Sequence, residues 1–245
     1  FDQDEIRAFL DEQGATYRYF EDEDGLLDRV VELIDTENIV GWFQDRMEFG
    51  PRALGSRSII GDARSERMQS SMNRKIKFRE SFRPFAPSVL EEKAGDYFDL
   101  DGPSPYMLLV APVAASKQLK LSADEQSVQE AGDLRERVHI KRSEVPAITH
   151  IDYSARVQTV DGGRYDRYYR LLQRFDARTA CPVIINTSFN IRGEPIVCAP
   201  ADAYRCFLNT EMDVLVLENF VLLKAEQNAT DRAASEKYRE EFPLD

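Results

Sequence analysis

Hydrophobic residues recur at helical spacing in the first part of the chain. One face of the helix predicted for residues 24–36 carries five apolar side chains, namely Leu26, Leu27, Val30, Val31 and Ile34. An earlier helix is predicted for residues 2–13, where Gly14 follows as a C-cap. Similar patterns predict helices at residues 65–77, with Ser65 as the capping residue, and at residues 91–98, 164–178 and 200–208.

Short apolar runs and alternating stretches predict strands between these helices. They cover residues 15–20, 39–43, 57–61, 84–90, 106–113, 156–160 and 183–186, and a pair at 213–217 and 220–224. Residues 50–55 hold two glycines and a proline and are expected to form an irregular loop. Residues 114–138 are expected to form a polar, irregular surface insertion, and residues after 225 a polar tail that frays or packs on a partner domain. Mixed hairpin-like and crossover links predict an α/β fold with a mixed sheet.

Composition narrows the class of protein. The net charge of −12 argues against general nucleic-acid binding. No run of 18 apolar residues is present, so no membrane span is predicted, and no basic-then-apolar signal segment opens the chain. Three cysteines without close pairing fit a reduced, cytoplasmic setting. With two histidines and no Cys-x-x-Cys, we expect no metal ligands in this chain.

Charge is unevenly distributed along the acidic chain. Residues 46–83 contain ten basic and four acidic residues, a balance of +6, so the remaining chain sums to −18. A concentrated cationic segment in an acidic protein indicates a small anionic ligand rather than a polymer. A solvated basic helix face is the alternative interpretation of the same pattern.

Two stretches inside this segment have residues suited to anion binding. In residues 50–58, Arg52 and Arg57 flank glycines whose backbone N–H groups a loop exposes. In residues 75–87, four cations alternate with three aromatic rings, which can bury the cationic stems or belong to an ordinary core; the cations are Lys75, Lys77, Arg79 and Arg83, and the rings Phe78, Phe82 and Phe85.

Two later stretches add polar side chains. Thr187, Ser188 and Asn190 follow an apolar strand, the position where α/β sheets bind ligands, although a local turn also uses Ser and Asn. Arg156 opens a strand, which is uncommon for a charge without a partner or ligand. Neither a nucleophile-elbow, a P-loop nor a zincin motif is present. Such a residue set suits phosphate recognition and electrostatic stabilisation of a transition state.

Three long motifs in order carry a specific resemblance. Residues 41–55, 73–87 and 185–195 resemble the C-terminal domain of the carbamoyltransferases that modify nodulation factors and antibiotics, and the resemblance covers residues 40–216. It implies a YrdC-like fold, a twisted open mixed sheet with flanking helices around a positively charged cavity. Members of that superfamily carry Lys-x-Arg and, much later, Ser-x-Asn, which here correspond to Lys77, Arg79, Ser188 and Asn190.

The resemblance also implies a reaction. The domain would take carbamoyl phosphate and ATP with Mg²⁺, cleave carbamoyl phosphate to carbamate and phosphate, and join carbamate to the α-phosphorus of ATP. Carbamoyl-adenylate and pyrophosphate would result. A separate actin-like N-terminal domain with a His-bound metal would then transfer the carbamoyl group to a hydroxyl, whose identity this chain does not reveal.

Domain organisation follows from the same resemblance. Because the sequence opens at Phe1 rather than Met, we expect a chain cut from a longer enzyme. Residues 1–37 would lead from the missing N-terminal domain, 38–224 would form the YrdC-like domain, and 225–245 a polar tail. The oligomeric state stays open, with a homodimer as one option.

Site roles are carried over residue by residue. The resemblance implies that Lys77, Arg83 and Arg156 hold carbamoyl phosphate as catalytic residues. Arg52, Arg57 and Arg79 would complete substrate binding, and Thr187, Ser188 and Asn190 would hold the nucleotide. One departure is Tyr153, which stands where the family has Gly after His-x-Asp. If that position has positive φ, a tyrosine there is costly.

Two other functions remain open. A non-catalytic module could bind nucleotide or carbamoyl phosphate and gate a partner domain, although the presence of Lys77, Arg79, Ser188 and Asn190 favours an enzyme. A threonylcarbamoyl-adenylate synthase-like enzyme would use threonine, bicarbonate and ATP. The charge of −12 and the carbamoyltransferase motifs count against it.

Overall fold

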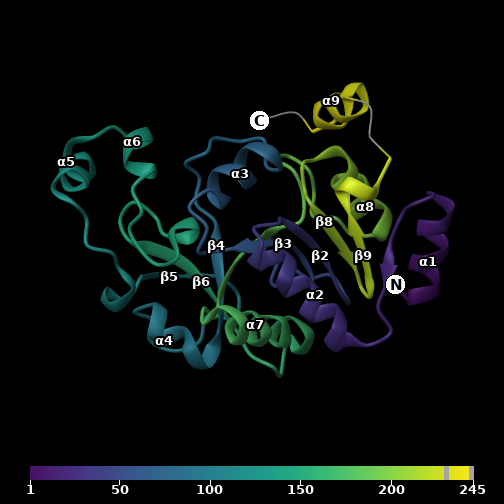
Figure 1. The fold of residues 1–245 in the computed structure, drawn as a ribbon, viewed down its shortest axis with the longest axis horizontal. Helices are drawn as coiled ribbons and strands as arrows, with labels where there is room; N and C mark the ends of the chain where they lie inside the picture. Colours follow the sequence, from purple (N-terminus) through teal and green to yellow (C-terminus); the bar gives the residue numbers. More distant parts are fainter. Residues whose placement is uncertain (229–231, 243–245) are drawn as a thin grey trace.

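The structure is a computed structural model that describes residues 1–228 and 232–242. Within these residues one open sheet of nine strands runs in the order β1-β9-β8-β2-β3-β7-β4-β6-β5 (Figure 1). The strands are β1 Arg18–Tyr19, β2 Val40–Phe43, β3 Arg57–Asp62, β4 Ala86–Leu90, β5 Leu109–Pro112, β6 Ser154–Val160, β7 Val183–Ser188, β8 Val214–Leu217 and β9 Phe220–Leu223.

The sheet is mixed. β2 pairs with β8, and β4 with β6, in parallel, while the other neighbouring pairs are antiparallel. β2, β3 and β4 are buried along their whole length, as expected for strands covered on both faces. The predicted α/β fold with an open mixed sheet is confirmed.

Helices flank the sheet. They are α1 Gln3–Glu12, α2 Glu23–Asp35, α3 Met68–Lys75, α4 Ala94–Tyr97, α5 Ala123–Ala131, α6 Leu134–Val138, α7 Asp166–Thr179, α8 Pro200–Asn209 and α9 Arg232–Glu240, with short 3-10 turns at Glu91–Lys93, Ala115–Lys117, Pro146–Ile148 and Lys224–Glu226. None of the helices that the structure describes is long and apolar enough to cross a membrane.

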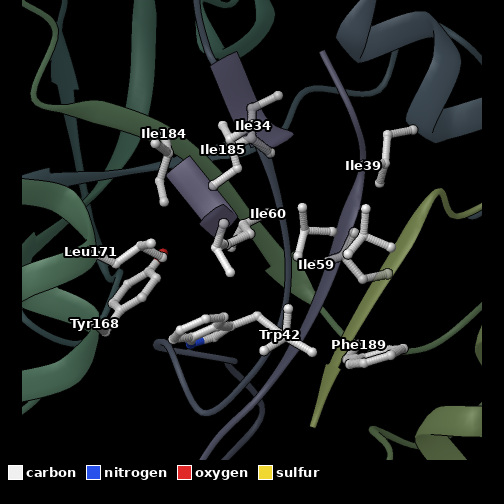
Figure 2. Packing of buried hydrophobic residues seen from close by; sticks show 14 of the residues in the cluster. Ile34, Ile39, Trp42, Ile59, Ile60, Tyr168, Leu171, Ile184, Ile185 and Phe189 are labelled. Carbon is white, nitrogen blue, oxygen red and sulfur yellow. The ribbon is translucent and has the colours of Figure 1, made fainter. Parts of the chain in front are cut away.

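The core lies on both faces of the central strands. Trp42 is fully buried and packs beside Tyr168 and Leu171 of α7, as Figure 2 shows. At the preceding residue of β2, a Cβ on Gly41 would lie 2.5 Å from Met212 Sδ and 2.7 Å from a ring carbon of Phe189, so a larger residue would have to displace these side chains. Ile6 of α1 joins the same cluster, so the first helices and the sheet share one core.

α2 and α7 lie side by side beneath the sheet and are joined by ion pairs (Figure 1). Arg170 bonds Glu23 at 2.7 Å, and Arg174 bonds Asp24 at 2.6 Å. These arginines therefore pair with acidic side chains of α2. Tyr168 of the same helix packs below the loop at residues 50–56.

Several predicted elements were wrong in extent or kind. The region 114–138 contains α5 and α6 rather than irregular chain, because Ser122 and Glu125 form a capping box that starts α5. Ser65 does not cap α3, which begins at Met68; instead its hydroxyl accepts from the Arg67 N–H. The strand predicted at 15–20 is reduced to two residues.

Both ends of the sheet differ from the sequence pattern. The predicted strand 106–113 forms only β5, an edge strand on which Leu109 and Val110 are exposed. The tail does not simply fray, because α9 packs against α8 and buries Tyr238. Residues 229–231 and 243–245 of that tail lie outside the described residues.

Tyr153 has φ +65°, so the position where the family has glycine is indeed left-handed. We expect Tyr153→Gly to raise the free energy of unfolding by about 1 kcal/mol, since glycine meets no Cβ penalty there. Denaturant unfolding would measure the change. Ala180→Gly, at the left-handed C-cap of α7, should act in the same direction. A lower stability for Tyr153→Gly alone would mean that its side-chain contacts outweigh the backbone strain.

Candidate functional site

Lys77 joins two segments that are far apart in the sequence. It follows α3, and its Nζ donates to the main-chain oxygens of Ser188 (2.5 Å) and Asn190 (2.8 Å) and to Asn190 Oδ1 (2.7 Å). The Ser188 hydroxyl also donates to Asn190 Oδ1 at 2.8 Å. The structure therefore brings Lys77 of the Lys-x-Arg pair together with Ser188 and Asn190 at the carboxyl end of β7.

Lys77 is almost completely buried, at 4% exposure. Burial, followed by the nearby Arg79 charge, lowers the pKa of Lys77 to about 7. Four oxygens lie within hydrogen-bond distance of Nζ, the fourth being the Ser188 hydroxyl at 3.4 Å, and they favour the charged ammonium form. Burial opposes these acceptors, so we expect Lys77 to lose its proton at a lower pH than an exposed lysine.

This shift predicts a pH dependence of stability. Between about 7 and the ordinary Lys pKa of 10.5, the unfolded chain binds more protons at this residue than the folded chain. Stability contributed through Lys77 should therefore rise with pH across that window and stay constant below it. Unfolding of the wild type and of Lys77→Met, compared from pH 6 to 10, measures the difference. A wild-type curve parallel to that of the variant would contradict the shift.

Further cations lie around Lys77. The Nε of Arg79 donates to Asn73 Oδ1 at 2.6 Å, and its guanidinium lies 5.0 Å from the Phe85 ring centre. Burial and the charge of Arg83 lower the pKa of Arg79 to about 10. Arg83 is exposed and pairs with Glu80 at 3.0 Å, and Arg192 approaches the same carboxylate at 4.0 Å.

The loop at residues 50–56 is held rigidly over the sheet. Glu48 Oε1 accepts from the N–H groups of Leu54 and Ser56, both at 2.7 Å. Gln158 of β6 donates to the Leu54 carbonyl at 2.7 Å, and Trp42 Nε1 donates to the Gly55 carbonyl at 2.8 Å. These bonds fix residues 54–56, the end of the loop that carries Arg52.

Arg52 and Arg156 lie close enough to repel each other. Burial and then the charge of Arg52 lower the pKa of Arg156. The Nε of Arg52 is buried without a hydrogen bond, and no carboxylate in the described part of the chain forms an ion pair with either guanidinium. Two half-buried cations that share a location without a counter-charge suit an anionic ligand.

Arg57 has a different environment from the other predicted substrate residues. It is 2% exposed and stacks on Phe43 with its guanidinium carbon 3.4 Å from the ring centre. Its terminal nitrogens donate to carbonyls of Gln44 (2.8 Å), Ser56 (3.0 Å), Asp45 (3.1 Å) and Cys198 (3.4 Å). Through these contacts Arg57 joins β2, β3 and the chain before α8, while its Nε, like that of Arg52, is buried without a hydrogen bond.

Thr187 does not share the contacts of its neighbour. It lies opposite Ile59 in the β3–β7 ladder, and strand alternation directs its side chain to the face opposite that of Ser188.

The three aromatic rings of residues 75–87 differ in burial: Phe85 is buried, Phe78 is half-buried, and Phe82 is 40% exposed. The core interpretation therefore holds for Phe85.

Sequence reasoning did not single out Asn73, Arg192 or Glu194. Asn73 lies in the motif at residues 73–87, fully buried, and its amide donates to the Arg83 carbonyl at 2.8 Å, so it shapes the cationic loop. Arg192 and Glu194 lie in the motif at residues 185–195, where spacing from Asn190 was the available signal. Among the described residues, no group of three or more His, Cys, Asp or Glu is arranged to hold a metal.

Comparison with known proteins identifies a family and several relatives of this chain. The family model described as carbamoyltransferase C-terminus matches residues 31–224. The Synechocystis protein sll1178 is 57% identical over 100% of this chain and 39% of its own length. Nodulation protein NolO of Bradyrhizobium diazoefficiens is 40% identical over 80% of this chain and 32% of its own. Nodulation protein NolNO of Sinorhizobium fredii is 38% identical over 85% of this chain and 28% of its own length.

A solved structure shares the fold. Full-length HypF, in its phosphate- and nucleotide-bound form, superposes with a TM-score of 0.51 at 16% identity, over 85% of this chain and 23% of HypF. At this identity the likeness concerns the fold alone. The chain spans less than two-fifths of the length of the curated relatives named above. With the family match over most of its length, the chain belongs to the carbamoyltransferase family and corresponds to that family's C-terminal region.

Proposed function

We propose that this chain binds carbamoyl phosphate and ATP and forms carbamoyl-adenylate. The observation that carries the proposal is the contact of Lys77 with Ser188 and Asn190, which unites two superfamily motifs at the end of β7. Carbamoyl phosphate and water would give carbamate and phosphate. Carbamate oxygen would then attack the α-phosphorus of ATP, and the bond to pyrophosphate would break.

The cations divide into two groups that suit two anions. Arg52 and Arg156, which lack a carboxylate partner among the described residues, would hold the carbamoyl phosphate oxygens. Lys77 would orient the loop carrying Ser188 and Asn190 against the nucleotide's α-phosphate, while Arg79 and Arg83 extend the positive charge. Displacement at phosphorus needs charge neutralisation and alignment of attacker and leaving group more than a protein nucleophile.

Mg²⁺ would enter with ATP. It is bound mainly by substrate phosphates and water in many nucleotide sites and needs few protein ligands. Its chemical contribution would be to neutralise phosphate charge.

Transfer to a hydroxyl acceptor would depend on sequence outside this chain. The relatives are more than twice as long as the segment they share with it. We propose that the remaining part of such a protein, the actin-like domain that the resemblance implies, receives the carbamoyl-adenylate. The isolated chain should therefore release pyrophosphate but leave hydroxyl acceptors unmodified.

The proposal is tested by pyrophosphate release from ATP-Mg with carbamoyl phosphate, with threonine plus bicarbonate, and with neither. Release that requires carbamoyl phosphate is the expected result. Release supported by threonine and bicarbonate would favour a threonylcarbamoyl-adenylate synthase. Saturable ATP binding by calorimetry without release under any condition would favour a binding module, and absence of both would remove the site assignment.

A further inference from the structure

α9 contacts the loop that follows β7, although the two are separated in sequence. The helix spans Arg232–Glu240 and lies beside α8 (Figure 1). It falls outside residues 31–224, the segment that the family model matches. Its Tyr238 is 2% exposed, a degree of burial uncommon for a tyrosine on a polar terminal helix.

A path of hydrogen bonds leads from Tyr238 to Lys77. The Tyr238 hydroxyl donates to Glu194 Oε1 at 2.5 Å. Glu194 Oε2 accepts from the Ile191 N–H at 2.8 Å, and the Glu194 main-chain oxygen accepts from Asn190 Nδ2 at 2.6 Å. Asn190 Oδ1 in turn accepts from Lys77 Nζ. Glu194 thus fixes both the backbone and the side chain of the Ser-x-Asn loop.

The groups around Glu194 influence its hydrogen bond with Tyr238. Burial raises the pKa of Glu194. Burial also raises the pKa of the neighbouring Cys206 thiol to about 12, so that thiol stays neutral. Glu194 is half-buried and Tyr238 is buried, so their hydrogen bond is partly shielded from competing water molecules. Tyr238 is the partner that keeps Glu194 oriented.

α9 is also fixed to the segment that carries Lys77. The Arg239 guanidinium lies 4.8 Å from the ring centre of Phe78, the residue after Lys77. On the other side, the Arg205 guanidinium of α8 lies 4.9 Å from the Tyr238 ring centre. The helix therefore contacts both of the segments that meet at Lys77.

We propose that α9 is a positioning element of the proposed nucleotide site, in which Tyr238, acting through Glu194, holds residues 188–191 in the form that binds ATP. The inference rests on the proposed function for its ligand. Tyr238 and Glu194 are positioning residues, since they act through Asn190 and Ile191 and need not touch the nucleotide.

Tyr238→Phe tests the inference, because it removes one hydroxyl and keeps the ring. The apparent KM for ATP in carbamoyl-phosphate-dependent pyrophosphate release should rise about tenfold, the size expected when a hydrogen bond to a charged group is lost. The kcat should change less than about twofold if chemistry is untouched. Tyr204→Phe on α8 is the matched control: Tyr204 is 8% exposed, and no described residue accepts a hydrogen bond from its hydroxyl.

Two further measurements separate positioning from a purely structural role. Hydrogen exchange of the Ile191 amide should accelerate in Tyr238→Phe and not in Tyr204→Phe. In the double variant Tyr238→Phe/Glu194→Gln, the rise in KM should be smaller than the product of the two single effects, because both residues act on one loop.

The outcomes are distinguishable from failure of the proposed function. If the wild type releases pyrophosphate and Tyr238→Phe changes neither the KM for ATP nor exchange at Ile191, the positioning role is overturned. If the wild type neither binds nor uses ATP, the proposed function fails. Exchange at Ile191 then decides alone whether α9 orders the loop.

Discussion

Lys77→Ala is expected to lower carbamoyl-phosphate-dependent pyrophosphate release by about 10²–10³-fold, the range seen when one preorganised charge-stabilising donor is removed. The variant removes the ammonium group that donates hydrogen bonds to Ser188 and Asn190. The oxygens of Ser188 and Asn190 that contact Nζ would lose their donor, so the loop would also lose its fixed form. Both effects act on kcat and on ATP binding.

Lys75→Ala provides the control for Lys77→Ala. Lys75 ends α3 two residues earlier, its side chain is 47% exposed, and it pairs with Glu211 at 3.4 Å. An exposed pair of this kind contributes little, so activity should stay within about twofold of wild type. Equal losses in the two variants, or full activity in Lys77→Ala with an unchanged fold by circular dichroism, would contradict the site assignment.

Gly55→Ala is expected to lower the free energy of unfolding by about 2–5 kcal/mol, the combined size of overpacking and backbone strain. Gly55 has φ +122°, and a Cβ there would lie 2.4 Å from a ring carbon of Tyr168. That ring cannot move easily, because Tyr168 is buried and its hydroxyl bonds Ser88 at 3.0 Å. The loop carrying Arg52 would shift instead.

Gly50→Ala separates the two causes. Gly50 begins the same loop at φ +139°, yet a Cβ there meets no atom within 4 Å. Only backbone strain remains, so we expect a loss of about 1 kcal/mol. Chemical denaturation measures both variants. If Gly55→Ala were as stable as Gly50→Ala, the packing of Tyr168 against the loop would be looser than the structure shows.

The sequence predicted those elements in which pattern and packing agree. The helix predicted at residues 24–36 corresponds to α2, whose apolar stripe meets the core. The predicted pair at 213–217 and 220–224 forms β8 and β9, with Glu218 at φ +49° in the turn. α5 has no apolar stripe in its sequence, since none of its residues is buried. The helix depends instead on the capping box at its start. α9 is likewise polar, and its packing depends on Tyr238.

Only part of the candidate site could be predicted from the sequence. The motifs located Lys77, Ser188 and Asn190, and the structure joins them. Arg57 and Arg156 look alike in sequence, yet one binds four carbonyls and the other has no ion-pair partner among the described residues. Which oxygens an arginine contacts depends on how segments more than a hundred residues apart come together in the fold. A local sequence pattern does not contain that information.

The distance along the chain between Lys77 and Ser188 has a consequence for folding. Their bond closes a loop of 111 residues, so its entropy cost is met only after β3, β7 and β4 have paired. No early, partly folded species would therefore contain the site. A ligand that needs Lys77 and Asn190 together would bind the finished sheet alone. It would slow global unfolding with little effect on the refolding rate, which makes the ligand a kinetic stabiliser of the whole domain.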